Sequence, residues 1–169
     1  MLRAYVRLLC FAAGLLAGVQ VPGFIQQYEV VVSAHLAEAR RALEPFAAIA
    51  ERHFNDDLAD LIAHYQANPD AVIGETGDGV AALAARVAHL EAERAALSGP
   101  WYRSAWHVGA DGDRELLRET AAGYNYRVPL QPTAIAWGLG IGLLLALLAE
   151  SVVALATLSL RRGSTSRRA

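Results

Sequence analysis

The chain of 169 residues contains no lysine and a single cysteine, Cys10, so several kinds of chemistry lack the residues they need. One cysteine excludes an intrachain disulfide and a metal site built from several thiolates. The sequence has no GxSxG for a serine hydrolase, and residues 74–79 (GETGDG) lack the Lys and Ser or Thr of a phosphate-binding loop. We therefore expect no enzymatic activity, no cofactor, no metal and no small-molecule substrate.

Charge is absent from two long segments near the ends of the chain. Residues 8–25 (LLCFAAGLLAGVQVPGFI) and 134–149 (AIAWGLGIGLLLALLA) carry none, and the second run resumes after Glu150 and Ser151 up to Leu160. A transmembrane helix needs about 20 predominantly apolar residues. The sequence predicts one transmembrane helix over residues 1–24 and another over residues 134–160.

The first apolar run can also be interpreted as a cleaved signal peptide, with MLRAYVR as its basic start and LLCFAAGLLAGV as its apolar centre. A cut after Ala17 or Gly18 would place Leu15 or Leu16 where the cleavage site requires a small residue. Leu9 before Cys10 does not match a lipoprotein site either. We favour a retained first span.

Arginines flank both apolar runs, whereas the segment between them is acidic. Residues 24–133 hold 9 Arg against 16 Asp and Glu, a formal charge of −7. Basic residues beside a span mark its cytoplasmic side. We expect a bacterial inner-membrane protein with cytoplasmic termini, a periplasmic domain at 25–133 and a basic cytoplasmic tail at 161–169. An acidic domain also argues against nucleic acid as a partner. The flanking arginines are Arg3, Arg7, Arg161, Arg162, Arg167 and Arg168.

Apolar residues recur every three or four positions after the first span, which predicts a long amphipathic helix. Its stripe consists of Ile25, Tyr28, Val32, Leu36, Ala39, Leu43, Phe46 and Ala50. Pro22 and Gly23 are expected to break the preceding helix, and Pro45 to kink this one.

Two further helices are expected in the middle of the chain. Asn55 is the expected cap of the first, which ends near residues 68–69. Residues 74–79 are predicted to form a turn, with Thr76 or Asp78 capping the second helix. That helix carries a coiled-coil-like seam made of Val80, Leu83, Val87, Leu90, Arg94 and Leu97. The two stripes predict an antiparallel pairing, within one chain or between two.

Ser98, Gly99 and Pro100 should end the seam helix, and an aromatic cluster follows it. This cluster of Trp101, Tyr102 and Trp106 could lie at a membrane interface or in the domain core, and the sequence leaves both open. A short helix is expected over residues 113–122. The predicted fold class is all-α, with two transmembrane helices flanking a periplasmic helical hairpin of coiled-coil type.

Several segments resemble a known bacterial family. They are VPGFIQQY (residues 21–28), HLAEA (35–39), LLRET (116–120) and VPLQPTAIAWGLG (128–140). This pattern resembles domain of unknown function 2937 over almost the whole chain. The resemblance implies a two-span inner-membrane protein with a helical middle region and a retained first span. It implies no catalytic residue.

Each predicted span contains two glycines four residues apart, Gly14 and Gly18 in the first and Gly138 and Gly142 in the second. Such spacing lets helix backbones approach closely in lipid. We expect close helix contact at these glycines, in an intrachain hairpin or a dimer.

Glu150 is an acid inside the second apolar run, where a charge at the centre of a bilayer costs roughly 2.5–3.5 kcal/mol. It could serve as a proton or ion site, or pair with a partner's basic group. We favour a glutamate that is tolerated near the inner surface.

Four potential metal ligands, His53, Asp57, Asp60 and His64, would share a face only on one continuous helix. With Asn55 as a cap that face is lost, and we favour a solvated acidic surface.

The leading functional expectation is a non-enzymatic scaffold or accessory subunit, contacting lipid and either itself or a larger inner-membrane complex. The alternative is a small transport or signalling component that uses Glu150.

Overall fold

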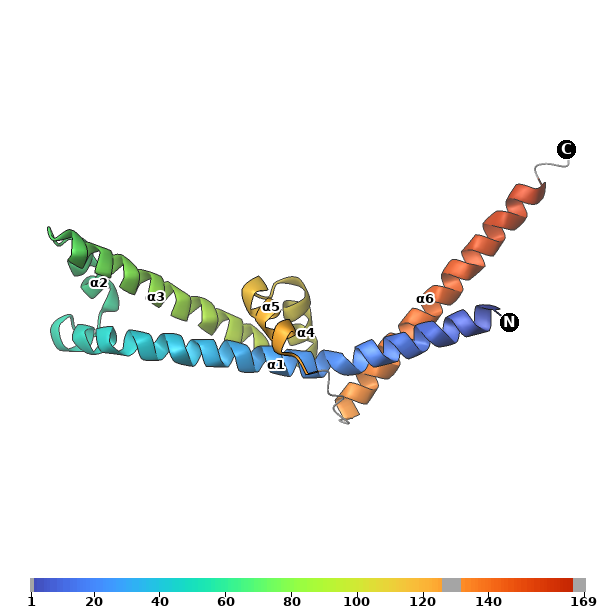
Figure 1. Ribbon diagram of the computed structural model, residues 1–169, viewed down its shortest axis with the longest axis horizontal. Helices are drawn as coiled ribbons and strands as arrows, with labels where there is room; N and C mark the ends of the chain where they lie inside the picture. Colours follow the sequence, from blue (N-terminus) through green and yellow to red (C-terminus); the bar gives the residue numbers. More distant parts are fainter. Residues whose placement is uncertain (1, 126–131, 166–169) are drawn as a thin grey trace. The chain divides into compact units, whose positions relative to one another are not determined.

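The computed structural model describes residues 2–125 and 132–165, and their side chains over 4–125 and 132–152. The described residues form six helices and no strand (Figure 1), so the predicted all-α class is confirmed. Residues 128–131, expected to lead into the second span, and the side chains of the basic tail at 161–169 lie outside this description. The helices are α1 (Leu2–His53), α2 (Leu58–Gln66), α3 (Ala71–Leu97), α4 (Trp101–Ala110), α5 (Arg114–Gly123) and α6 (Pro132–Thr165).

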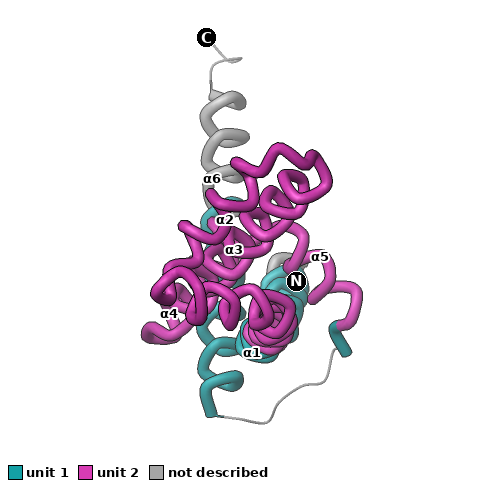
Figure 2. Tube along the Cα trace, turned by 90° about the vertical axis from the view of Figure 1, so that its left-hand side faces the viewer, with its two compact units in different colours: residues 1–26, 124–169 teal, residues 27–123 magenta. Residues whose placement is uncertain are grey.

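The chain divides into two compact units, which Figure 2 distinguishes by colour. Unit 1 consists of residues 1–26 and 124–169, and unit 2 of residues 27–123. The first half of α1 and all of α6 belong to unit 1. The second half of α1 and helices α2 to α5 belong to unit 2.

Helix α1 continues through Pro22 and Gly23, so the predicted break there is wrong. Proline removes a single backbone donor, and an apolar helix tolerates this where neighbouring groups compensate. Tyr124 contacts α1 on both sides of the proline. Its hydroxyl lies 3.1 Å from the carbonyl oxygen of Gln20 and 2.9 Å from the side-chain oxygen of that residue. Its ring packs edge-on against Phe24, with the ring centroids 5.5 Å apart.

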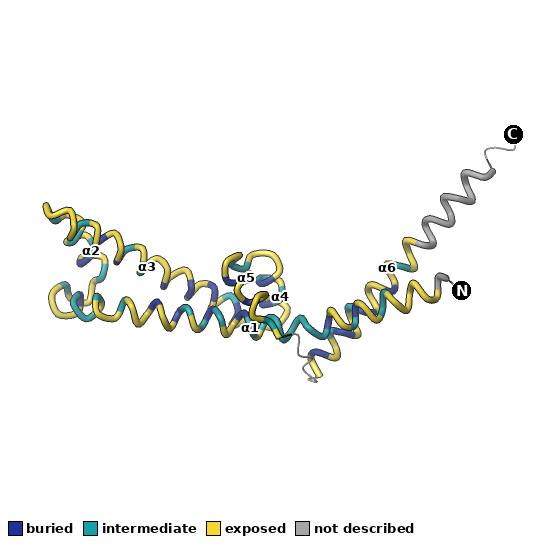
Figure 3. Tube along the Cα trace, viewed as in Figure 1, coloured by how far each residue is buried: buried dark blue, intermediate teal, exposed yellow. Residues whose placement is uncertain are grey.

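The apolar stripe predicted on α1 is confirmed, because none of its members is exposed (Figure 3). Tyr28, Val32, Leu36, Ala39 and Ala50 are buried, and the remaining three are partly buried. α1 also continues through Pro45. Helical periodicity therefore locates the side of α1 that faces the rest of unit 2.

The cap of α2 is Asp57, so the predicted cap at Asn55 is wrong. Asp57 has an extended backbone, and its side chain accepts hydrogen bonds from the amides of Ala59 and Asp60 at 2.8 and 3.2 Å. Asn55 and Asp56 instead have φ angles of 51° and 67°. Asn and Asp tolerate this left-handed region better than other side chains, so here they reverse the chain between α1 and α2.

Residues 74–79 lie inside α3, so the turn predicted there is wrong. α3 begins at Ala71, and the side chain of Asp70 caps it by accepting from the amide of Val72 at 2.9 Å. The predicted caps Thr76 and Asp78 are wrong, because both residues lie inside α3; the hydroxyl of Thr76 donates to the carbonyl of Val72.

Gly77 explains why a glycine occurs in this helix. An added Cβ at Gly77 would lie 2.9 Å from Cβ of Tyr65 on α2. Glycine is therefore needed for the close packing of α2 on α3 rather than for a turn.

The buried side of α3 includes an acid that the predicted seam does not contain. Val80, Val87, Leu90 and Leu97 are buried as the seam requires, but Arg94 is exposed. The buried charged residue is its neighbour Glu93, only 6% exposed. α3 ends at Leu97, as predicted, with Ser98 at its C-terminus.

Candidate functional site

Unit 2 contains a cluster of polar side chains, here called the polar cluster: Tyr28, His89, Glu93, His107 and Asp113. Tyr28 and Glu93 are buried, His107 and Asp113 are partly buried, and His89 is exposed. The hydroxyl of Tyr28 donates to Oε2 of Glu93 at 2.8 Å and accepts from the amide of Asp113 at 2.9 Å. Nε2 of His107 lies 2.9 Å from the same Glu93 oxygen, and Nε2 of His89 lies 2.9 Å from Oδ2 of Asp113. The cluster thus joins α1, α3, α4 and the start of α5.

Local sequence explains how Asp113 reaches this position. Its Oδ1 accepts from the amides of Glu115 and Leu116 at 2.8 and 3.1 Å, so Asp113 caps α5. Its second carboxylate oxygen remains available for His89, while its own amide binds Tyr28. Asp113 therefore caps α5 and also contacts α1 and α3.

Burial and hydrogen bonding shift the acidity of two groups in the polar cluster. Tyr28 is fully buried, and this burial, together with its bond to Glu93, raises the pKa of its hydroxyl well above the ordinary value. The hydrogen bond from His89, and next the amide of Leu116, lower the pKa of Asp113 below its ordinary value. Tyr28 is thus held as a neutral donor and Asp113 as a carboxylate.

Further polar contacts join the helices of unit 2 outside the cluster. Nε2 of His35 lies 2.8 Å from Oε2 of Glu119, linking α1 to α5. Nη2 of Arg86 lies 3.2 Å from Nδ1 of His35. Because a guanidinium can only donate, Nδ1 of His35 accepts the hydrogen bond from Arg86. Nε2 therefore carries the hydrogen and donates it in the hydrogen bond to Glu119. Arg40 also pairs with Glu91 at 2.6 Å.

These arrangements satisfy donors and acceptors rather than activate them. Among the described residues, each buried side-chain nitrogen or oxygen has a hydrogen-bond partner. The polar cluster offers carboxylates bound by histidines and a tyrosine whose ionisation is disfavoured. Its chemistry is that of a structural link between helices.

In unit 1, α1 and α6 meet at the four glycines named from the sequence, each of which is buried. An added Cβ at Gly14 would lie 2.9 Å from Cα of Gly142, and one at Gly18 would lie 2.8 Å from Cα of Gly138. The glycines of one helix thus face those of the other within one chain. Gly140, between the two on α6, has open space around its Cβ position.

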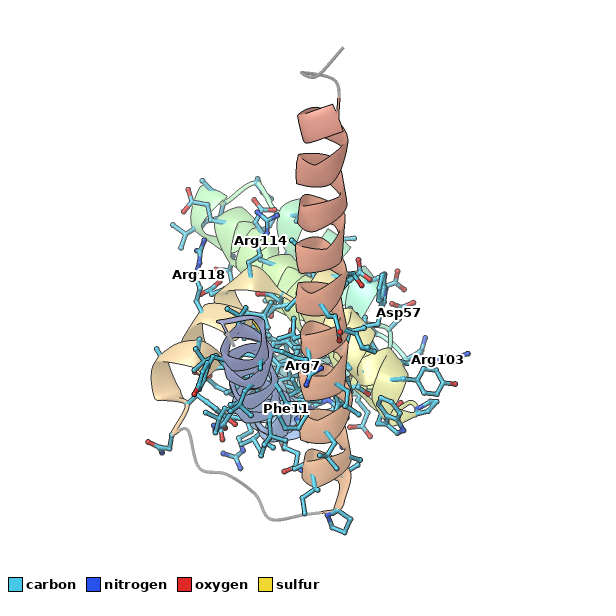
Figure 4. All side chains as sticks on the ribbon, turned by 90° about the vertical axis from the view of Figure 1, so that its right-hand side faces the viewer. Arg7, Phe11, Asp57, Arg103, Arg114 and Arg118 are labelled. Carbon is cyan, nitrogen blue, oxygen red and sulfur yellow. The ribbon has the colours of Figure 1, made fainter. Side chains whose placement is uncertain are left out.

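Glu150 forms an ion pair with Arg7, with an oxygen to nitrogen distance of 3.6 Å. Both side chains are more than half exposed, at 61% and 58%. They lie at the edge of a groove of about 470 Å³ between α1 and α6, whose other lining residues are apolar. Figure 4 labels Arg7 and Phe11, which line this groove from α1. The partner of Glu150 within the chain was not predicted from the sequence.

Two helices are long and apolar enough to cross a membrane: one candidate is Ala4–His53 and the other is Pro132–Val152. Only 11% of the most apolar 18-residue window of each is buried. Large apolar side chains are exposed on both, including Leu9, Leu16, Leu143 and Leu147. Burial in a protein core therefore does not account for their composition.

The four residues considered as metal ligands do not share a helix. α1 ends at His53, whereas Asp57 precedes α2 as its cap. Asp60 and His64 lie on α2 and are exposed. Within the described part of the chain, no group of three His, Cys, Asp or Glu side chains could hold a metal ion.

Sequence reasoning did not identify the polar cluster. Glu93 and His107 were available as polar residues beside apolar stripes, but their partner Tyr28 is 65 residues from Glu93 in the chain. The one usable signal was Asp113 at the start of a predicted helix, a position typical of a cap.

Comparison with known proteins identifies a family but no activity. No curated protein and no solved structure matches the chain significantly. The family model described as Protein of unknown function (DUF2937) matches residues 2–162, which is nearly the entire chain. The earlier resemblance is confirmed, and the chain belongs to the DUF2937 family.

Proposed function

We propose that this protein is a non-enzymatic, two-span inner-membrane protein that acts as a scaffold or accessory subunit of a membrane complex. The observation that carries the proposal is the pairing of α1 with α6 through glycines while their large apolar side chains remain exposed. In lipid, small residues let helix backbones approach, and the larger apolar residues face the acyl chains. Such a pair anchors unit 2 and leaves most of its outer surface available for lipid or a partner.

The proposed topology places both termini in the cytoplasm and unit 2 in the periplasm. It rests on the arginines at the two ends of the chain and the acidic segment between them. Reporter fusions after Ala169 and after Asp111, in the exposed loop before α5, are expected to report cytoplasm and periplasm respectively. A periplasmic signal from the C-terminal fusion would contradict the two-span topology.

Affinity purification from native membranes in mild detergent tests the scaffold proposal. We expect a membrane protein, or a second copy of this chain, to co-purify in a fixed ratio. Because Gly14, Gly18, Gly138 and Gly142 face one another within the chain, a partner is expected to use other faces of the spans. Recovery of monomers alone from several mild detergents would count against a scaffold.

A transport or signalling role for Glu150 is the second candidate, favoured by the groove between α1 and α6 where Glu150 pairs with Arg7. Glu150→Gln keeps the shape of the side chain and removes its charge. The scaffold proposal expects this variant to accumulate normally and to retain its partner. Loss of the partner in Glu150→Gln, with retention in Ser151→Ala, would favour the second candidate.

A further inference from the structure

Helix α4 presents the aromatic cluster outward. Trp101, Tyr102 and Trp106 are 59%, 54% and 73% exposed, so the core location considered from the sequence is wrong. The inner side of α4 is fixed to the rest of unit 2 by Ser104, Val108 and His107. The hydroxyl of Ser104 donates to the carbonyl of Leu97 at 3.0 Å. Tyr102 and Trp106, four residues apart on α4, therefore lie opposite its packed face.

The polar cluster fixes α4 to α3 and α1 within unit 2. His107 on α4 contacts Glu93, and Glu93 accepts from Tyr28 on α1.

The exposed tryptophan and tyrosine side chains of α4 suit the headgroup layer of a bilayer. The hydrocarbon core is about 30 Å thick and the whole bilayer about 40–45 Å, which leaves roughly 5–7 Å of headgroup layer on each side. We infer that the exposed face of α4 lies in this layer, with Trp106 and Tyr102 among the headgroups. The inference rests on the proposed membrane-spanning function.

The composition of α4 suits a phospholipid surface. Tryptophan and tyrosine are enriched at membrane interfaces because their rings are apolar and their polar groups bind water or headgroups. Arg103 is exposed on the same helix (Figure 4), and α4 itself contains no acidic residue although the domain is acidic overall. A guanidinium in the headgroup layer can bind lipid phosphate.

Single-tryptophan variants of the whole chain in phospholipid vesicles test the inference. The chain has three tryptophans, so Trp101→Phe with Trp137→Phe leaves Trp106 alone. We expect lipids brominated near the headgroup to quench Trp106 more strongly than lipids brominated near the chain ends. Iodide in solution is expected to quench Trp106 several-fold less than a tryptophan that faces water.

Val72→Trp, in a chain whose other tryptophans are phenylalanine, supplies the water-facing control. Val72 lies at the start of α3 and is 72% exposed, against 73% for Trp106. Equal iodide quenching of the two reporters would overturn the inference. Protection of Trp106 from both iodide and brominated lipid would overturn it as well, because protein would then cover α4.

Leu144→Trp in the same tryptophan-free chain reports on the span itself, since Leu144 is exposed within the apolar run of α6. Quenching of this reporter by bromine near the chain ends is expected. Its absence would refute the two-span proposal, and the inference with it. Deep quenching of Leu144→Trp together with a water-exposed Trp106 would refute the inference alone.

Discussion

Gly18→Ala is the sharpest perturbation of the contact between α1 and α6. The new Cβ would lie 2.7 Å from the carbonyl oxygen of Trp137 and 2.8 Å from Cα of Gly138. Both neighbours are backbone atoms of a helix, which cannot rotate away as a side chain can. Ordinary contact begins at 3.4 Å, so the two helices would have to separate by about 0.7 Å at this point.

A separation of this size has a calculable cost. A gap of 0.5–1 Å forfeits about a quarter to a half of the dispersion energy of each contact it opens. Overpacked sites typically lose about 1–3 kcal/mol. Alanine also regains about 0.8–1 kcal/mol of helix propensity over glycine. Gly140→Ala receives the same gain, and its Cβ would meet no atom within 4 Å. We therefore expect Gly18→Ala to be less stable than Gly140→Ala by about 1–3 kcal/mol.

Denaturation of the purified protein in mixed detergent micelles, followed by far-ultraviolet circular dichroism, measures this difference. The two variants add the same methyl group to the same kind of residue, so solvation and propensity changes largely cancel between them. Equal stability of Gly18→Ala and Gly140→Ala would refute the reasoning that the glycines are needed for close helix approach.

Two predictions concern the polar cluster. Tyr28→Phe removes a hydrogen bond to a buried carboxylate and leaves the amide of Asp113 without its partner, so it should lower the free energy of unfolding by about 1.5–3 kcal/mol. Tyr102→Phe, at a half-exposed position, should leave denaturant unfolding unchanged, and equal losses in both variants would contradict this account. The His89 hydrogen bond holds the pKa of Asp113 below its ordinary value of 3.8. The stabilisation that ionised Asp113 gives the folded state is thus present above pH 3.8 and is lost as the pH falls through the lowered pKa of Asp113. Acid titration of unfolding should show a smaller loss in Asp113→Asn, and an unchanged titration would argue against this role.

The stripe on α1 could be read from the sequence because burial of one helical face imposes a period near 3.6 residues. Tyr28, Val32 and Leu36 follow that period and are buried. Helix ends were harder to locate, since they depend on competing local choices. Asn55 and Asp57 can both cap a helix, and the structure uses Asp57 because Asn55 adopts a left-handed backbone.

Features that depend on distant partners could not be predicted. Gly77 looks like a turn residue until α2 packs against it, and only then does the absence of a side chain become a packing requirement. Glu93 adjoins a predicted apolar seam. No feature of the sequence around it indicates that hydrogen bonds with Tyr28 and His107 offset the free-energy cost of burying its side chain. The partner of Glu150 is similar, because Arg7 lies at the opposite end of the chain.

The bond between Tyr28 and Asp113 spans 85 residues, which constrains the order of events during synthesis. Tyr28 leaves the ribosome early, whereas the amide that it accepts from is made much later. At about 5–20 residues per second, the interval is roughly 4–17 seconds. For that time the apolar stripe of α1 has no completed set of partners. The hydrogen bond between α1 and the start of α5 is therefore among the last contacts of unit 2 that can form.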